Sequence, residues 1–381
     1  MHLDWTKEQI AEYERSVEFA RLQLEPGTAE RDCQSQFSPE LWLACAKFGV
    51  LGWCFPEQYG GGGLDLTSTI RRLEGIGYGC SDNGLTLGLN GQMWSVQEPL
   101  MTFGNDEQKQ RYLSALCRGE ILAAHGMTEK NSGSDAFALS TSAKKVDGGY
   151  LLNGEKHYVG LAPVADIALI FARTDPNAGQ WGISAFIVEK GFEGYSAGSR
   201  ELKMGLRSSP VGSITMNNCF VPMENRLGPE GIGVSIFTHS MDWERGFIFA
   251  SHLGAMHRQF DTCVEYARNR KQFGRPIGQF QAVSHRVADM KVRLDTARML
   301  LYRVAKLKED GKPCTAEAAM AKLHISESLL RNSEDAVRIH GALGYFSEYG
   351  IERSLRDAAG GVIYSGSSDI QRNIIASSLG L

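Results

Sequence analysis

Two changes in the period of the hydrophobic pattern constrain the fold of this 381-residue chain more than any other feature. Residues 1–120 and 231–381 place apolar side chains at helical spacing, whereas residues 121–230 hold short alternating runs between Gly, Pro and Asn clusters. A helix buries one stripe and a strand buries one face, so each pattern specifies its own kind of element. The sequence therefore predicts an α+β protein with an N-terminal α-helical domain, a middle β domain and a C-terminal helical bundle domain over those three ranges.

Local signals indicate where elements begin and end. Helix starts in the first range carry capping residues: Thr6 with Gln9, Ser38 with Pro39, and Asn105 with Gln108. In the second range, Asp147-Gly148-Gly149 predicts a turn between strands of a small barrel or sandwich. The long two-sided helical pattern after Gly231 predicts a bundle that packs on copies of the chain.

Composition limits the function classes. The formal net charge of −4 predicts no binding to nucleic acid or to an anionic membrane, and no run approaches the length of a membrane span. The N-terminal MHLDWTKEQ lacks the basic and apolar regions of a secretory signal, which predicts a cytoplasmic protein. The eight cysteines form no CxxC pair and no His lies at metal spacing, so we expect buried free thiols and no metal site.

Two polar segments are candidate ligand sites. MTEKNSGSD, residues 127–135, lies where the helical part gives way to the first strand, and its glycine and hydroxyls suit a polar ring edge or a phosphate. VIYSGSSDIQRN, residues 362–373, presents backbone N–H groups, hydroxyls and an acid at a helix N-terminus. Taken alone, the first segment is better described as a polar surface loop.

Six motifs in a fixed order carry a family resemblance. They are TEKNSGSD, LLNGEKHYV, KMGLRSSPVGS with CFVP, YARNRKQFGRPIGQFQ, IHGALGY and YSGSSDIQR. In this order and spacing they resemble the acyl-CoA dehydrogenase family over nearly the whole chain. The resemblance implies the acyl-CoA dehydrogenase fold, with a four-helix bundle as the C-terminal domain, and a homotetramer that holds one FAD per subunit.

The resemblance also implies which residues contact FAD. They are Met127 and Thr128 on the pyrimidine side of the flavin; Gly133 and Ser134 near the pyrophosphate; Tyr158 and Val159 beside the flavin ring; Arg270 and Phe273, which match positions that reach the FAD of a neighbouring subunit; Gln281, Arg338 and Gly341; and Ser367 and Asp369 at the adenosine part. Without the resemblance, Arg270 would be interpreted as a solvated cation at a helix C-terminus.

Several positions depart from the family pattern. Gly160 stands where a Thr near flavin N5 is common, which opens the hypothesis that dioxygen, rather than an electron-transfer protein, reoxidises the flavin. Arg338 stands where a Gln is common, and Ala342 where a Gly is common. Ser365 stands where many relatives carry the catalytic glutamate, and a serine hydroxyl is a poor proton acceptor without a helper.

Glu244 is the expected base. Isovaleryl-CoA dehydrogenases and similar members of the family place the glutamate on the first long bundle helix, just before an Arg, and MDWERGFIF supplies Glu244 and Arg245 there. Burial between Trp243 and Phe247 would raise the pKa of this carboxyl toward neutrality, as a general base requires. The alternative is a surface glutamate on a helix, the commonest fate of that residue.

The implied reaction is α,β-desaturation of an acyl thioester by an FAD-dependent dehydrogenase or oxidase. Glu348 and Glu352 are weaker candidates for the base. The predicted substrate pocket comprises Trp243, Arg245, Tyr364 and Ser365. On this hypothesis Glu244→Gln abolishes turnover, whereas Ser365→Ala has a mild effect.

One branch of the family is more similar in local sequence. HSMDWERG, GQFQAVSHRVADMK with RLDTARMLLYR, and SGSSDIQRNIIASSLGL resemble the L-prolyl carrier-protein dehydrogenases of secondary metabolism. That resemblance implies oxidation of a prolyl group tethered by phosphopantetheine to a carrier protein, giving a pyrroline or pyrrole thioester. The alternatives are a short- or branched-chain acyl-CoA dehydrogenase and, from another class, a scaffold protein without flavin.

Overall fold

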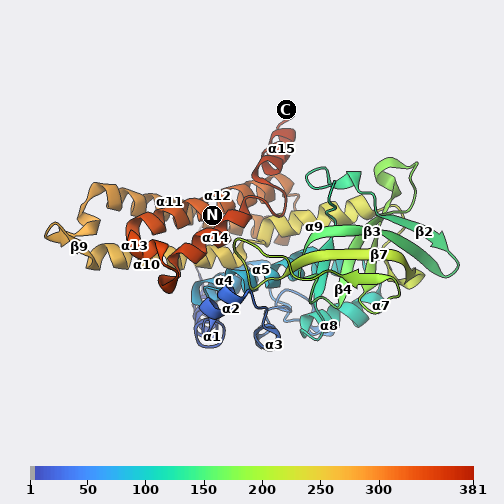
Figure 1. Cartoon of the computed structure of the whole chain (residues 1–381), viewed down its shortest axis with the longest axis horizontal. Coiled ribbons are helices and arrows are strands. Elements are labelled where there is room, and N and C mark those ends of the chain that lie inside the picture. Colours follow the sequence, from blue (N-terminus) through green and yellow to red (C-terminus); the bar gives the residue numbers. More distant parts are fainter. Residues whose placement is uncertain (1–4) are drawn as a thin grey trace.

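The computed structural model describes residues 5–381. Figure 1 shows bundle helices running to one end of the molecule, strands at the other end, and the N-terminal helices below. Helices, strands and helices again follow one another along the chain. The predicted α+β architecture, with a middle sheet between two helical parts, is confirmed.

The helices α1 to α8 precede the first strand. Their bounds are α1 Lys7–Phe19, α2 Thr28–Gln34, α3 Pro39–Phe48, α4 Leu66–Gly79, α5 Asn83–Gln92, α6 Glu98–Phe103, α7 Asp106–Gln108 and α8 Ser114–Cys117. The predicted caps are confirmed, because Thr6 and Gln9 form a capping box, Asn105 and Gln108 form another, and Ser38 caps α3.

The middle part is one connected sheet of eight strands. They are β1 Ala123–Gly126, β2 Ser142–Val146, β3 Gly149–Gly160, β4 Ile167–Arg173, β5 Ile183–Glu189, β6 Tyr195–Ala197, β7 Val211–Pro222 and β8 Arg226–Leu227. The order is β6-β7-β3-β2-β4-β5-β8, and β1 pairs in parallel with β4. The predicted turn joins β2 to β3, with Gly148 at a φ of 74° that glycine adopts without strain.

A bulge interrupts β3 near its C-terminal end, where β3 pairs with β7. The register of β3 against β7 shifts between Lys156 and Val159, so β3 carries one extra residue there. Tyr158 takes the left-handed backbone conformation at the bulge, with a φ of 56°, and its side chain is 65% exposed. The bulge therefore turns Tyr158 away from the sheet core.

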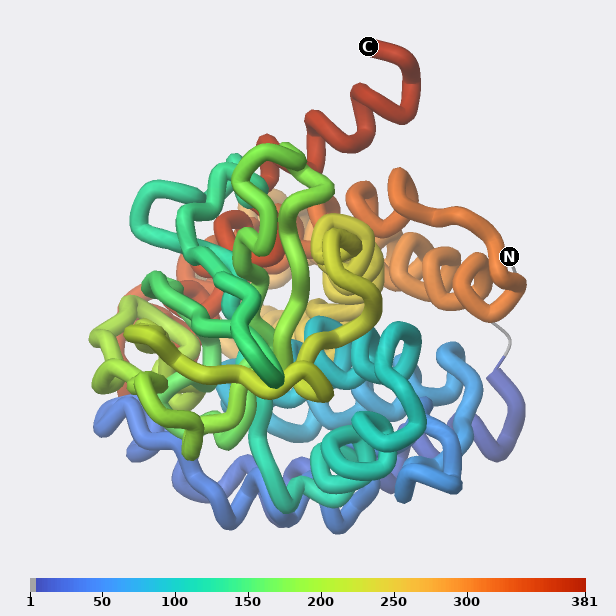
Figure 2. Tube along the Cα trace, turned by 90° about the vertical axis from the view of Figure 1, so that its right-hand side faces the viewer, coloured from blue at the N-terminus to red at the C-terminus, as the bar shows by residue number. Residues whose placement is uncertain are grey.

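The third part contains long helices joined by a small hairpin. Its elements are α9 Gly233–Phe247, α10 Ala250–Asn269, β9 Lys271–Gln272, β10 Arg275–Pro276, α11 Gln281–Glu309, α12 Thr315–His340, α13 Ala342–Tyr345, α14 Ile351–Gly361 and α15 Ser368–Ser378. The helical pattern after Gly231 is not one helix, because the chain turns at Ile248 and Phe249 between α9 and α10. Figures 1 and 2 both show α15 projecting away from the rest of the chain.

Both faces of the central strands are buried. Leu169 and Phe171 of β4 join a large core that continues into the N-terminal helices and the bundle. Their neighbours Ala168 and Ile170 point to the other face and join a second core within the sheet. The sheet is thus packed against the helical parts along its length, which fixes its edge relative to α9.

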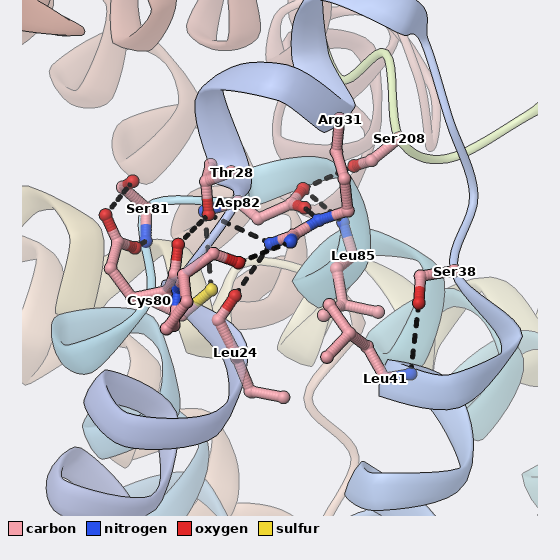
Figure 3. A network of polar contacts seen from close by, with 12 residues as sticks. Leu24, Thr28, Arg31, Ser38, Leu41, Cys80, Ser81, Asp82, Leu85 and Ser208 are labelled. Carbon is pink, nitrogen blue, oxygen red and sulfur yellow. Dashed lines mark hydrogen bonds and ion pairs between the residues drawn. The ribbon is translucent and has the colours of Figure 1, made fainter.

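A polar junction connects the N-terminal helices to the sheet (Figure 3). Asp82, the N-cap of α5, accepts a hydrogen bond from the Ser208 hydroxyl of the loop before β7 and one from Arg31 Nε at 2.9 Å. Arg31 is buried and also donates to Leu24 O and to the Thr28 hydroxyl. The segment KMGLRSSPVGS is therefore held in place by the first domain.

The cysteines agree with the expected free thiols, with one correction. All eight are unpaired, and six are buried: Cys45, Cys80, Cys117, Cys219, Cys263 and Cys314. Cys54 is partly buried, but Cys33 is exposed, so the prediction of burial is wrong there. The reason is its position on α2, whose buried side chains are Thr28 and Arg31 rather than Cys33.

Within residues 5–381, no helix combines the length and the apolar character that crossing a membrane requires.

Candidate active site

Glu244 lies one turn before the end of α9 and meets the turn that follows α14. The Ser365 hydroxyl donates a hydrogen bond of 2.5 Å to Glu244 Oε1. Burial raises the pKa of the Glu244 carboxyl above its usual range, and the Ser365 hydrogen bond, Arg245 and Lys322 oppose that rise. A carboxyl with a raised pKa that is still paired with a donor is suited to accept a proton near neutral pH.

The turn from Gly361 to Ser368 is fixed by hydrogen bonds at several points. Ser365 and Gly366 both have left-handed backbones, with φ of 57° and 81°. The buried Gln371 side chain donates through Nε2 to Ser365 O at 3.1 Å and to Gly366 O at 2.8 Å. Ser368 N–H closes the turn on Val362 O at 3.0 Å. A strained serine held in this way keeps its hydroxyl in one direction.

A fully buried lysine lies behind the same turn. Lys322 of α12 donates from Nζ to Gly361 O at 2.9 Å. Burial lowers the pKa of Lys322 to about 8, although Glu244 and Glu327 favour its charged form. Lys322 therefore anchors the end of α14 and adds positive charge near the carboxyl of Glu244.

Two polar groups beside Glu244 have no hydrogen-bond partner among residues 5–381. The Tyr364 hydroxyl is buried and unpaired, and its ring stacks on Phe249 with centroids 5.6 Å apart. Arg245 Nε is also buried and unpaired, and the guanidinium has only Asp242, at 3.6 Å, as an ion-pair partner. Unpaired buried donors are costly unless a ligand satisfies them, so both suit the polar groups of a substrate.

Trp243, the residue before Glu244, belongs to an aromatic cluster. Trp243 stacks on Trp94 with centroids 6.0 Å apart and lies 5.8 Å from the Phe247 ring. Lys308 Nζ lies 4.7 Å from the centroid of the Trp243 ring. The structure joins Glu244 to Ser365, with Arg245 and Tyr364 next to them in sequence. Trp243 packs on Trp94, Phe247 and Lys308, so its place in the predicted substrate pocket stays a prediction.

The loop from residue 127 to 135 is anchored from below by a buried ion pair. Glu129 Oε1 lies 2.8 Å from Lys156 Nζ, and Glu129 also accepts hydrogen bonds from the backbone and hydroxyls of Ser140 and Thr141. Lys156 Nζ donates in addition to Met127 O at 3.1 Å. Burial alone would raise the pKa of Glu129, but Lys156 and these donors lower it to about 2.

Above this anchor the loop presents unpaired polar groups. Met127 is buried, whereas Gly133 and Ser134 are exposed, and a Cβ added at Gly133 would meet no atom within 4 Å. Among the described residues, the Thr128 and Ser134 hydroxyls have no hydrogen-bond partner. Thr128 O accepts from His157 N–H at 2.9 Å, which joins the loop to the bulge that carries Tyr158 and, next to it, the buried Val159.

The remaining predicted cofactor residues lie elsewhere. Figure 1 places the β9–β10 hairpin at the end of the bundle opposite the sheet. Arg270 and Phe273 belong to that hairpin, Gln281 begins α11, and Arg338 and Gly341 lie at the end of α12; all five are exposed. Within one chain, this group and the 127–135 loop are not brought together.

The start of α15 is a third location. The Ser367 side chain accepts the Ile370 N–H at 3.3 Å and caps the helix. Asp369 is exposed and forms an ion pair of 2.8 Å with Arg372. Of the weaker base candidates, Glu352 is paired with Arg356 at 2.6 Å on α14, and Glu348 is exposed.

Sequence reasoning missed several supporting residues: Glu129, Lys156, Lys322 and Gln371. Each is buried and polar, and all but Lys322 lie in a sequence motif that indicates a role for other residues. A charged residue inside an apolar helix is the signal that could have identified Lys322, within MAKLHI. Glu129 and Lys156 carry no such signal, since their pairing joins two separate motifs.

Family models of acyl-CoA dehydrogenase match the chain in three consecutive parts. The N-terminal domain matches residues 6–120, the middle domain 124–219 and the C-terminal domain 231–380. These matches cover most of the chain.

Individual relatives are similar over nearly their full length. An L-prolyl-[peptidyl-carrier protein] dehydrogenase from Pseudomonas fluorescens is 42% identical over 346 residues, which is 91% of each chain. The crystal structure of the prolyl acyl carrier protein oxidase AnaB is 44% identical, with a TM-score of 0.98 over 99% of this chain and 100% of its own. PigA, solved with FAD and proline, is 38% identical, with a TM-score of 0.97 over 100% of both chains.

Proposed function

The chain belongs to the acyl-CoA dehydrogenase family, and from that membership we propose that it oxidises a prolyl group held as a thioester on a carrier protein. It is an FAD-dependent oxidoreductase that acts on an acyl thioester. The observation that carries the catalytic assignment is the Glu244 carboxyl, which is held by Ser365 beside the unpaired Tyr364 and Arg245.

The residues of the chain fit an FAD. The 127–135 loop has unpaired hydroxyls at Thr128 and Ser134 and open space at Gly133, which suit the polar edge and the phosphates of the cofactor. The Glu129–Lys156 pair makes the loop rigid, so these donors need no reorganisation on binding. When bound, FAD supplies the acceptor for the hydride that leaves the substrate.

Glu244 provides the proton-transfer step. We assign it to accept the α-proton of the prolyl thioester, because burial raises its pKa and a free Oε2 remains once Ser365 occupies Oε1. The substrate loses one proton to Glu244 and one hydride to the cofactor, and a double bond forms in the ring. Arg245 and Lys322 oppose the rise in the pKa of Glu244 and so favour its ionised form.

Arg245 and Tyr364 are proposed to bind the substrate. Arg245 follows Glu244 on α9 and Tyr364 precedes Ser365, and the Arg245 Nε and the Tyr364 hydroxyl are buried without a hydrogen-bond partner among residues 5–381. A thioester carbonyl or a ring nitrogen would satisfy them, which a purely aliphatic acyl chain does only in part.

The substrate assignment is tested by offering the enzyme each candidate substrate in turn. Purified enzyme is incubated separately with prolyl-loaded carrier protein, with prolyl-CoA and with butyryl-CoA, and the loss of hydrogens is followed by mass spectrometry. We expect desaturation of the carrier-bound prolyl group, and none by Glu244→Gln. Desaturation of the CoA esters alone would instead support the short- or branched-chain acyl-CoA dehydrogenase alternative.

We further propose a cytoplasmic homotetramer. The exposed Phe273, Tyr345 and Phe346 at the bundle end are typical of a surface that another subunit covers.

For the electron acceptor we keep two alternatives, dioxygen and an electron-transfer protein. A Cβ added at Gly160 would meet no atom within 4 Å, so the space beside the bulge is open. Peroxide formed during turnover in air would support dioxygen, and turnover only with a partner flavoprotein would exclude it.

A further inference from the structure

We propose that Ser365 is a positioning residue for the base: its hydroxyl holds Oε1 of Glu244, so that Oε2 is the oxygen left to accept the proton. The hydrogen bond between them is 2.5 Å long and joins α9 to the turn after α14, 121 residues away in sequence. This inference rests on the proposed role of Glu244. It revises the sequence-based expectation that Ser365→Ala has a mild effect.

The turn is constructed to aim this hydroxyl. Ser365 keeps a φ of 57°, which is unfavourable for a residue with a side chain, and it keeps it because the surroundings determine it. Gln371 binds the carbonyls of Ser365 and Gly366, and Ser368 N–H donates to Val362 O at 3.0 Å. The backbone is thus fixed before and after Ser365, independently of Glu244.

The other polar groups around Glu244 do not replace this bond. Arg245 on α9 is directed to Asp242, and Lys322 on α12 donates to Gly361 O. Tyr364 has no hydrogen-bond partner. Among residues 5–381, Ser365 is the one side chain that donates a hydrogen bond to the Glu244 carboxylate. Arg245 and Lys322 stabilise its charge from a distance, whereas Ser365 also sets its direction.

Loss of the hydroxyl has two consequences. A hydrogen bond to a charged acceptor stabilises the ionised form, so its removal raises the pKa of Glu244 further. The carboxylate also becomes free to rotate, which lowers the fraction of enzyme in the productive orientation. The activity lost through the raised pKa depends on pH, whereas the activity lost through the rotating carboxylate does not.

Ser365→Ala and Ser365→Gly separate the hydroxyl from the backbone strain. Both remove the donor, but glycine also relieves the left-handed conformation. In both variants we expect the acidic limb of kcat/KM against pH to move up by about one pH unit, which is a tenfold loss at pH values below the limb. We expect a lower kcat with little change in KM, because the substrate-binding donors remain.

Ser368→Ala is the matched control. It deletes a hydrogen bond from a serine hydroxyl to a glutamate in the same turn, but the acceptor is Glu327 rather than Glu244. We expect the limb to stay at its wild-type position in this variant. Wild-type kcat with an unmoved limb in both Ser365→Ala and Ser365→Gly would overturn the proposal, and so would an equal loss in Ser368→Ala, because the Ser365 hydroxyl would then have no specific effect on Glu244.

Thermal unfolding gives a second readout that needs no turnover. The folded protein holds a proton on Glu244 above the pH at which the unfolded chain loses it, so this group's contribution to stability falls as pH rises through the folded pKa. In Ser365→Ala the unfolding free energy should keep falling to a higher pH than in the wild type. In the Glu244→Gln background the Ser365→Ala change should no longer alter this pH dependence. If Glu244→Gln keeps full turnover, the base assignment itself is wrong. If Glu244→Gln abolishes turnover and the Ser365 variants keep the wild-type kcat, limb and unfolding profile, only this inference is wrong.

Discussion

Two regions predicted to contact the cofactor differ in how the chain supports them. The 127–135 loop lies on a buried ion pair between Glu129 and Lys156, with further hydrogen bonds to the start of β2. The β9–β10 hairpin has two-residue strands, and its tip residue Phe273 is 93% exposed. Partners within the same chain hold the 127–135 loop in place, whereas the tip of the β9–β10 hairpin is left exposed.

The difference indicates which parts of the site one subunit can build alone. The loop and the Glu244–Ser365 contact are fixed by buried partners, so their geometry should persist in an isolated chain. Phe273 is uncovered by residues 5–381, and among their aromatic rings it contacts only Phe280, at 5.9 Å between centroids. The hairpin thus suits a contact with a second copy, as we propose.

The largest effect is expected from a change at Glu244, which belongs to the part of the site that a single chain builds. Glu244→Gln keeps the shape of the side chain and its contact with Ser365 but cannot accept a proton. We expect kcat to fall by about 10²- to 10⁴-fold, with flavin content and oligomeric state unchanged. Rapid-mixing measurement of flavin reduction is the check, and Glu352→Gln, on α14 in an ion pair with Arg356, is the control. Near-normal reduction in Glu244→Gln would move the base elsewhere.

The sequence was informative where a local pattern carries the signal and uninformative where distant segments meet. Capping residues such as Thr6 and Asn105 and the turn at Gly148 were predicted because each depends on neighbours a few residues away. Glu244 was identified because an Arg follows it and the usual position holds Ser365. The contact between those two residues was not predicted, since it needs the angle between α9 and the turn after α14.

The second test removes the support of the 127–135 loop. Glu129→Gln leaves Lys156 buried without a counter-charge, which should cost about 3–5 kcal/mol of unfolding free energy and weaken flavin binding. Thermal unfolding and the ratio of flavin absorbance to protein absorbance are the measurements. Glu155→Gln is the matched control, because Glu155 precedes Lys156 on β3 but is exposed. Equal stability of the two variants would show that the ion pair does not anchor the loop.

Acid titration addresses the same anchor without mutation. The pKa of Glu129 is lowered to about 2, so its stabilising contribution is present above the unfolded value of about 4.3 and is lost as pH falls toward 2. The loss attributable to this group is about 3 kcal/mol. Unfolding free energy of the wild type and of Glu129→Gln should therefore converge at low pH, and parallel curves would contradict the assignment.

The smallest expected effect on a single chain concerns the hairpin. Arg270→Ala with Phe273→Ala removes two exposed side chains and should change the unfolding free energy of the isolated chain by less than about 0.5 kcal/mol. If the hairpin completes the cofactor site of a neighbour, the same variant should lose flavin on dilution and shift toward smaller assemblies, as measured by light scattering with absorbance detection. Lys271→Ala, on the same hairpin and also exposed, should retain both. Retention of flavin and assembly by the double variant would show that the bundle end contributes nothing to the site, and the contrast between the two regions would then be one of stability alone.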